Sequence, residues 1–237
     1  PGGAATTADA FTFQTDGSTD TVTAVTVTLA PGTFASLLQL QITDDAESTV
    51  YGSVNPLSDT PSIQLTTPIT ATTTSTQYKI RVRPESHALM PAPPGSSYAL
   101  TARVTSWTSS NFNHAGSDSA GTTVTIDNLS PGNVTGATAT SGTTQVTLAW
   151  TNPADSDLGT IIVLRRAGSA VGDTPTEGAT YSVGNIIGSS TVACVVTAPA
   201  TTCTDDTVDN GTVYHYKLFP RDFSRNYATG VVPTGSP

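Results

Sequence analysis

Three histidines carry the side chain that proteins use most often as a catalytic base or metal ligand. They are His87, His114 and His215. His87 and His114 follow successive expected strands, and the loops after successive strands of a meander lie at opposite ends of a sandwich. About eight residues at about 3.3 Å each place these two loops about 26 Å apart. His215 is expected to point outward from a different half of the chain, so the histidines predict neither a shared metal site nor a catalytic pair.

A nucleophilic serine or cysteine needs an activating base and a turn that presents it. Serine is abundant, but the sequence holds no Gly-x-Ser-x-Gly elbow, and neither cysteine has a base near it along the chain. Nucleophilic hydrolysis therefore lacks its parts. We expect this protein not to be an enzyme.

Carboxylates gather in several turns, and calcium prefers oxygen-rich loops of this kind. Asp155 and Asp157 follow Pro153 in a turn and are the best candidates for calcium ligands. The alternative is that they are ordinary solvated turn residues, because acidic turn formers are common in a chain of net charge −9. No acidic cluster matches a twelve-residue EF-hand loop. Beyond this calcium candidate, no cofactor is expected.

The two cysteines, Cys194 and Cys203, bracket a short loop that contains Pro199. This spacing favours a disulfide within a hairpin, with two unpaired buried thiols as the alternative. It fits no common zinc pattern, and no histidine lies nearby to complete a ligand set. A bridge closing about ten residues contributes about 2–3 kcal/mol through loop entropy. It also predicts an oxidising compartment, which places the protein outside the cell or on the cell surface.

Composition decides which elements position these residues. Charged residues make up 11% of the 237 residues, with only two Lys and three Glu, whereas about 25% is usual. Threonine and valine are abundant, and β-branched side chains favour strands while the helix-surface residues are scarce. The fold class is therefore predicted to be all-β.

Charge and hydropathy exclude two classes of partner. The net charge of −9 is spread without a basic run, which disfavours nucleic-acid binding. The longest apolar run, at 192–196, is far shorter than the about 20 residues of a membrane helix, so no membrane insertion is expected. Residue 1 is Pro rather than Met, which favours a segment of a longer chain over a complete mature one.

Short alternating runs separated by turn residues predict eight strands in the first half, at 11–13, 22–29, 37–42, 50–54, 63–65, 78–82, 98–104 and 122–126. Turn formers and Pro131 at 127–133 then interrupt the pattern, and a new alternation follows. The expected organisation is a linker at 1–8 and two tandem antiparallel β-sandwiches at 9–129 and 130–237.

Two stretches carry family resemblances. The sequence TTVTIDN at 122–128 resembles the closing strand of bacterial surface immunoglobulin-like repeats, which implies an immunoglobulin-like sandwich over 9–129. VTLAWTNP at 146–153 and VDNGTVY at 208–214 resemble the second strand and the tyrosine corner of a fibronectin type III domain over about 133–232. The second resemblance implies that Trp150 and Tyr214 anchor a core, with Tyr216 and Leu218 inward and His215, Lys217 and Phe219 outward. The chain departs from the family between residues 167 and 203.

A basic stripe is the most distinctive expected surface. Lys79, Arg81 and Arg83 alternate outward on one strand, and antiparallel pairing with 98–104 would set Arg103 opposite Lys79. Like charges facing each other are unfavourable. We therefore expect an acidic partner there: a neighbouring module, another copy in an assembly, or an anionic surface glycan. The alternative is an ordinary solvated sheet face.

These features together predict a non-catalytic structural or adhesive module of an exported bacterial cell-surface or extracellular multi-domain assembly, such as a filament. The alternative is an accessory or carbohydrate-binding module of a secreted polysaccharide-degrading enzyme. Such modules usually show a planar row of exposed aromatics. With 6% aromatic residues, most of them assigned inward, the sequence shows no such row.

Overall fold

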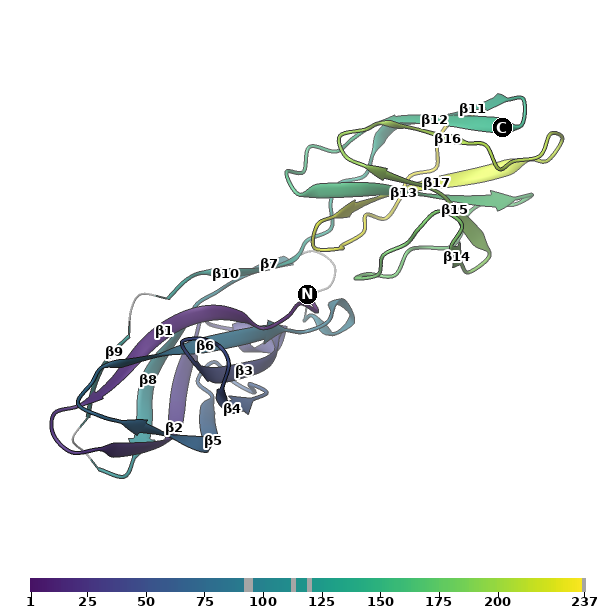
Figure 1. The fold of residues 1–237 in the computed structure, drawn as a ribbon. Coiled ribbons are helices and arrows are strands. Elements are labelled where there is room, and N and C mark those ends of the chain that lie inside the picture. Colours follow the sequence, from purple (N-terminus) through teal and green to yellow (C-terminus); the bar gives the residue numbers. More distant parts are fainter. Residues whose placement is uncertain (92–95, 112–113, 119–120, 236–237) are drawn as a thin grey trace. The chain divides into compact units, whose positions relative to one another are not determined.

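The computed structural model describes residues 1–91, 96–111, 114–118 and 121–235. The chain divides into two compact units, Pro1–Asn128 (unit 1) and Leu129–Pro237 (unit 2). Every pairing between strands in the described residues is antiparallel, which confirms the predicted all-β class (Figure 1). Among those residues, no helix has the length and apolar character needed to cross a membrane.

The described residues of unit 1 form ten strands and two short 3-10 turns, Thr33–Ser36 and His87–Leu89. The strands are β1 (Thr6–Thr15), β2 (Asp20–Leu29), β3 (Leu37–Asp44), β4 (Val50–Val54), β5 (Ser62–Ala71), β6 (Thr76–Pro84), β7 (Ser96–Leu100), β8 (Ala102–Ser109), β9 (His114–Asp118) and β10 (Val124–Asn128). The expected linker at 1–8 is wrong at its end, because β1 begins at Thr6 and pairs there with β6.

Eight strands of unit 1 form one sheet in the order β8-β2-β5-β4-β3-β6-β1-β9, while β7 and β10 pair separately. Its two halves meet where β5, paired with β2, also pairs with β4 at Gly52 and Leu65. A Cβ at Gly52 would lie 2.5 Å from the Gln64 carbonyl oxygen, so this contact requires glycine. The immunoglobulin-like strand order stays a prediction for this unit.

Strand β1 carries a bulge that aims a carboxyl group inward. Its register against β6 shifts between Thr7 and Asp9, leaving Ala8 as the extra residue. From Asp9 onward every second residue faces the interior, so Asp9 shares its face with Phe11 and Phe13. Asp9 is 2% exposed.

The pairing expected for the basic stripe is wrong. Strand β6 lies between β1 and β3, whereas β8, which carries Arg103, pairs with β2. The predicted strand at 98–104 is interrupted at Thr101, and its two parts belong to different sheets. Lys79 and Arg103 therefore do not face each other. The alternation within β6 is confirmed, because Tyr78, Ile80 and Val82 are buried.

Unit 2 has a three-stranded sheet, β11-β12-β16, and a four-stranded sheet, β14-β15-β13-β17. The strands are β11 (Thr135–Gly142), β12 (Gln145–Thr151), β13 (Leu158–Ala167), β14 (Ile186–Ile187), β15 (Ser190–Thr197), β16 (Thr202–Asp205) and β17 (Tyr214–Asp222). A terminal segment pairs with β17 at Leu218 and Val231. The two sheets form a β-sandwich with Trp150 and Tyr214 in its core, and its resemblance to a fibronectin type III domain stays a prediction.

The outward position expected for Phe219 is wrong. Phe219 is 0% exposed and belongs to a second hydrophobic cluster with Val171, Val192 and Tyr227. Part of the long segment between residues 167 and 203 folds over the outer face of the four-stranded sheet. Both faces of β17 are therefore buried near Phe219, and strict alternation cannot predict that.

Cys194 and Cys203 form a disulfide. Cys194 lies on β15 of the four-stranded sheet and Cys203 on β16 of the three-stranded sheet. The expected hairpin location is wrong, because the chain crosses from one sheet to the other between these strands. The bridge fastens the two layers of the sandwich to each other.

Candidate binding site

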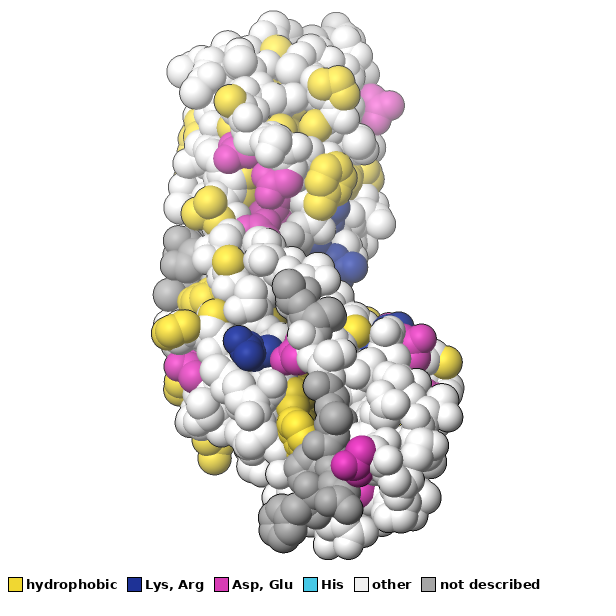
Figure 2. All heavy atoms as spheres, turned by 90° about the vertical axis from the view of Figure 1, so that its left-hand side faces the viewer, with side chains coloured by type: hydrophobic (Ala, Val, Ile, Leu, Met, Phe, Trp, Pro, Cys, Tyr) yellow, Lys and Arg dark blue, Asp and Glu magenta, His cyan; other side chains and the backbone are white. Residues whose placement is uncertain are grey.

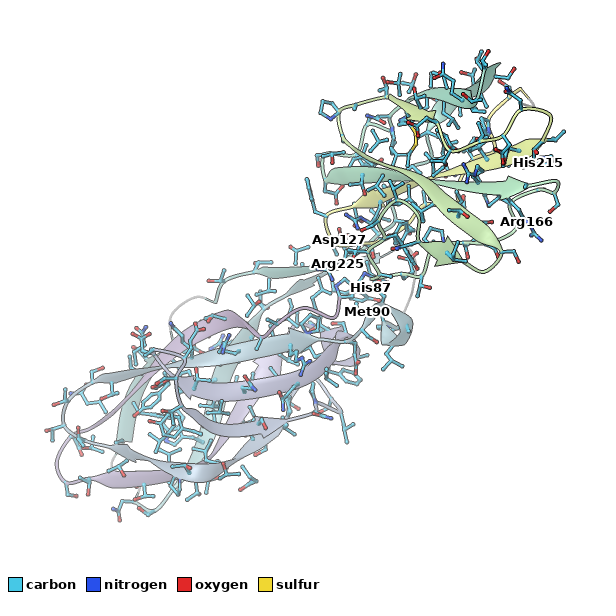
Figure 3. All side chains as sticks on the ribbon, turned by 45° about the vertical axis from the view of Figure 1, so that its right-hand side comes forward. His87, Met90, Asp127, Arg166, His215 and Arg225 are labelled. Atoms are coloured by element: carbon cyan, nitrogen blue, oxygen red, sulfur yellow. A yellow bond between two sulfur atoms is a disulfide. The ribbon has the colours of Figure 1, made fainter. Side chains whose placement is uncertain are left out.

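The histidines lie in different surroundings. His87 is buried in the 3-10 turn of unit 1, and His215 lies on β17 of unit 2, opposite Arg166 on β13 (Figure 3). The backbone of His114 lies on β9, but its side chain is outside the described residues. His87 and His215 therefore belong to different compact units.

The basic stripe finds its counter-charges within unit 1. Lys79 Nζ lies 3.3 Å from Glu47 Oε1 and 3.5 Å from Asp45 Oδ1, and Arg81 Nη2 lies 3.2 Å from Glu47 Oε2. A hydrogen bond from Thr7 and then one from Lys79 lower the pKa of the Glu47 carboxyl. Acidic residues of the same unit thus lie against Lys79 and Arg81, because the turn between β3 and β4 returns over β6. Arg83 is exposed at the end of that strand.

The two calcium candidates are held differently. Asp155 Oδ2 accepts a hydrogen bond of 2.9 Å from the Gly132 backbone N–H. A carboxylate oxygen of Asp157 lies within 4.8 Å of one of Asp222. Asp222 is fully buried and accepts hydrogen bonds from the backbone and side-chain amides of Asn226. The calcium site stays a prediction.

A buried ion pair connects the two sheets of unit 2. Arg165 Nη1 lies 2.8 Å from each carboxylate oxygen of Asp205, whose side chain is 1% exposed. The Tyr216 hydroxyl donates to Asp205 Oδ2 at 3.0 Å, and Thr207 donates from its backbone and its hydroxyl to Oδ1. Burial, and then the charge of Asp205, raise the pKa of Tyr216 well above its ordinary value.

Arg165 also borders a polar depression on the surface of unit 2. The depression has a volume of about 540 Å³, and its lining includes Arg165, Arg166, Thr191 and Tyr214. Arg165 lies over the Tyr214 ring at 5.1 Å, and its charge is already neutralised by Asp205. This network therefore stabilises the sandwich, and it leaves Arg165 little capacity to bind an anion.

Unit 1 contains two buried carboxyl groups, Asp9 and Asp118, that lack hydrogen-bond donors like those around Asp205. Asp9 Oδ1 accepts a hydrogen bond of 2.8 Å from Ala10 N–H. Asp9 Oδ2 and both oxygens of Asp118 are buried and accept no hydrogen bond from an N–H or hydroxyl group of the described residues. Buried carboxylates normally have such donors.

The nearest cation does not supply the missing bonds. Arg103 Nε is 4.0 Å from Asp118 Oδ2, and the Arg103 side chain is 69% exposed. That separation exceeds hydrogen-bond length. Burial, and then hydrogen bonding to Asp118, raise the pKa of Asp9 to about 7. A proton on Asp9 thus allows the two carboxyl groups to share a hydrogen bond.

An aromatic cavity adjoins Asp118. It has a volume of about 180 Å³, and its lining includes Phe11, Phe13, Val104, Trp107 and Asp118. The Phe13 ring meets the Trp107 ring at 5.4 Å and an interplanar angle of 67°. Hydrophobic atoms reach the surface of unit 1 at several places in Figure 2.

The fold explains why the cavity is there. Strands β8 and β9 are the two edge strands of the eight-stranded sheet, and among the described residues no strand pairs with both of them. Phe11 lies opposite Asp118 in the β1–β9 pair, which puts both on one face. A Cβ at Gly121 would lie 2.9 Å from the Ala102 carbonyl oxygen and 3.4 Å from Asp9 Cγ. The chain therefore passes close over Asp9 at a residue without a side chain.

Sequence reasoning missed this site. Asp9 could have been predicted to face the interior, because it lies two residues before Phe11 and four before Phe13 on the same strand. Asp118 gave no comparable signal, since the strand at 114–118 was not expected. Only the β1–β9 pairing brings the two carboxyl groups together.

No protein-family model and no curated protein matches the chain. Among solved structures, the chain is similar to a two-domain fibronectin type III segment of chicken tenascin, at 12% identity and a TM-score of 0.34 over 97% of this chain and 98% of that one.

Two further solved structures are similar to this chain. The FN1-FN3 domains of chicken CNTN1 match at 9% identity and a TM-score of 0.36, over 90% of this chain and 56% of that one. The spore cortex lytic enzyme SleM of Clostridium perfringens matches at 15% identity and a TM-score of 0.31, over 44% of this chain and 28% of that one. The chain thus spans about a quarter of SleM and about half of the CNTN1 segment. At these TM-scores the likeness decides neither fold nor function.

Proposed function

We propose that this chain is a non-catalytic structural or adhesive module of an exported bacterial cell-surface or extracellular multi-domain assembly. The main observation in support of this proposal is that ionisable side chains of both units form ion pairs within the fold. Arg165 and Asp205 tie the sheets of unit 2 together, and Lys79, Arg81 and Glu47 tie strands of unit 1 together. Groups committed to such bonds stabilise a scaffold and are not available to react with a substrate.

Two further observations support export and a scaffold role. The Cys194–Cys203 bridge is of a kind that persists in oxidising compartments. Both units are compact β-structures with their own hydrophobic clusters, which suits a module joined to others.

The test combines secretion with two binding and activity assays. We expect the full chain, exported to a bacterial periplasm, to carry an oxidised cysteine pair. We also expect it to release no reducing sugar from a panel of polysaccharides and to give no signal on a glycan array. Saturable binding to a neutral polysaccharide would instead support the accessory-module alternative. Release of sugars by the purified chain would refute the non-catalytic proposal.

A further inference from the structure

We infer that Asn210, in the exposed turn between β16 and β17 of unit 2, is a site of covalent self-modification. The backbone nitrogen of Gly211 attacks the Asn210 side-chain amide, and the asparagine becomes aspartate or isoaspartate. Asn210–Gly211 is the only Asn-Gly pair in the sequence. The inference goes beyond the proposed function and does not depend on it.

The attacking nitrogen belongs to a residue with nothing around it. Gly211 is exposed and has a φ of 83°, and a Cβ built on it would meet no atom within 4 Å. Among the described residues, its N–H donates no hydrogen bond. No side chain therefore shields this nitrogen, and no acceptor within that part of the chain holds it away from Asn210.

The carbonyl under attack is already polarised by the fold. Asn210 Oδ1 accepts a hydrogen bond of 2.9 Å from the backbone N–H of Thr144, which lies in the turn between β11 and β12. Attack at Cγ places negative charge on Oδ1, and a donor fixed at that oxygen stabilises the charge, as in an oxyanion hole. The Nδ2 atom, which leaves, has no hydrogen-bond partner among the described residues.

The reaction balances with water as its only co-reactant. A bond forms between Gly211 N and Asn210 Cγ, the bond from Cγ to Nδ2 breaks, and the N–H proton departs with Nδ2 as ammonia. Solvent water then opens the cyclic imide. Cleavage at Cγ gives aspartate, and cleavage at the backbone carbonyl gives isoaspartate, in which the chain runs through the former side chain. Either product adds one negative charge, and nothing is oxidised or reduced.

Asn185 shows why the polarised carbonyl is not sufficient by itself. It is exposed in another turn of unit 2, and its Oδ1 accepts a hydrogen bond of 2.9 Å from the Ser182 backbone N–H. The next residue is Ile186, whose β-branched side chain crowds the nitrogen that would have to attack. Asn185 is therefore a matched internal control within the same protein.

The isoaspartate product is expected to disturb the turn more than the aspartate product. Val208 and Tyr214 are buried on either side of it, and the Asp209 backbone N–H donates to the Tyr214 hydroxyl at 3.2 Å. Isoaspartate inserts a methylene group into the backbone between these two anchors, whereas aspartate keeps the backbone length. The isoaspartate form should consequently unfold at a lower urea concentration than Asn210→Asp, which carries the same charge.

The experiment is peptide mapping by mass spectrometry of the full, oxidised chain, kept folded at neutral pH and sampled over weeks. We expect the peptide that contains Asn210 to be replaced by two acidic isomers, while the peptide that contains Asn185 stays unchanged. The Asn210→Asp variant identifies the aspartate isomer by its retention time. The same chain unfolded in urea is the positive control for the chemistry.

Two variants test the assignment of the reacting atoms. Gly211→Ala should slow the conversion, because a side chain then crowds the attacking nitrogen. Asn210→Gln keeps an exposed amide whose ring closure would need a larger ring, so it should stay unmodified even if Gly211→Ala disturbs the turn. An Asn210 that stays intact in the folded chain would overturn the inference, as would conversion of Asn185 at the same rate or an unchanged rate in a folded Gly211→Ala variant. The secretion, glycan and hydrolysis assays test the module proposal separately, so these results do not affect it.

Discussion

Replacing Asp9 by Asn should stabilise unit 1 at neutral and alkaline pH. Asp9 is a buried carboxyl whose folded pKa of about 7 lies above its ordinary value of 3.8. The folded state therefore holds this proton more tightly than the unfolded state. The stability that depends on it is fully present below about pH 4 and is lost as pH rises through 7. An asparagine amide cannot ionise, so the variant avoids this loss.

The magnitude follows from the two pKa values. A pKa raised from 3.8 to about 7, at about 1.36 kcal/mol for each pKa unit, corresponds to about 4 kcal/mol at high pH. Asp9 is 2% exposed, but its partner Asp118 lines an open cavity. Water there screens part of the charge, so we expect the variant to be more stable by about 2–4 kcal/mol at pH 8. At pH 4 the two proteins should be equally stable.

The assay must report on unit 1 separately, because two units need not unfold together. The chain has two tryptophans, with Trp107 in unit 1 and Trp150 in unit 2. Fluorine NMR of protein labelled with 5-fluorotryptophan gives one signal for each unit. Urea unfolding followed through the Trp107 signal, at pH values from 4 to 8, yields the free energy of unfolding of unit 1.

Parallel pH profiles for the parent and the Asp9→Asn variant would refute the reasoning. So would a variant that is less stable at pH 8, since Asp9 would then be stabilised as a charge. Asp16→Asn provides the control, because Asp16 lies in an exposed turn between β1 and β2 and should not alter the profile. The urea concentration at which the Trp150 signal shows half-unfolding should be the same in all three proteins at each pH.

Three further predictions concern unit 2. Trp150→Ala should lower the unfolding free energy of unit 2 by about 3–5 kcal/mol, because the ring is 5% exposed, and fluorine NMR of protein labelled with 3-fluorotyrosine can follow the unfolding of this unit. Arg165→Met should cost about 3–5 kcal/mol in urea unfolding, since Asp205 would stay buried and charged without its cation. Mass spectrometry after alkylation of the denatured, unreduced protein should find neither Cys194 nor Cys203 modified. Replacing both by Ser should cost about 2–3 kcal/mol.

Each of these predictions has a result that contradicts it. Thr151→Ala, at an exposed position, and Arg166→Met, at the neighbouring arginine that does not pair with Asp205, are the controls and should change stability by less than about 0.5 kcal/mol. If Trp150→Ala unfolds like its control, the ring is not a core anchor. If Arg165→Met equals Arg166→Met, the ion pair contributes nothing. Two alkylated cysteines would exclude the bridge.

The alternation of apolar and polar residues along a strand correctly predicted which side chains of β6 are buried. Tyr78, Ile80 and Val82 are buried and Lys79 lies between them, because the side-chain period of a strand is two residues whatever the strand pairs with. The resemblance to a fibronectin type III domain, not alternation, predicted that Trp150 and Tyr214 are in the core of unit 2, where both lie. Alternation failed at Phe219, where a distant segment covers the second face of the strand.

The composition and spacing of this sequence by themselves determined the all-β class and the turn chemistry, since both depend on neighbouring residues. Strand partners were decided only in the tertiary structure. Nothing near Arg103 indicates that its strand joins β2, and nothing near Asp118 indicates that it lies beside Asp9. The carboxyl pair and its aromatic cavity exist because two edge strands of one sheet leave an opening over the same core. That juxtaposition is a long-range property of the sheet, and no period along the chain encodes it.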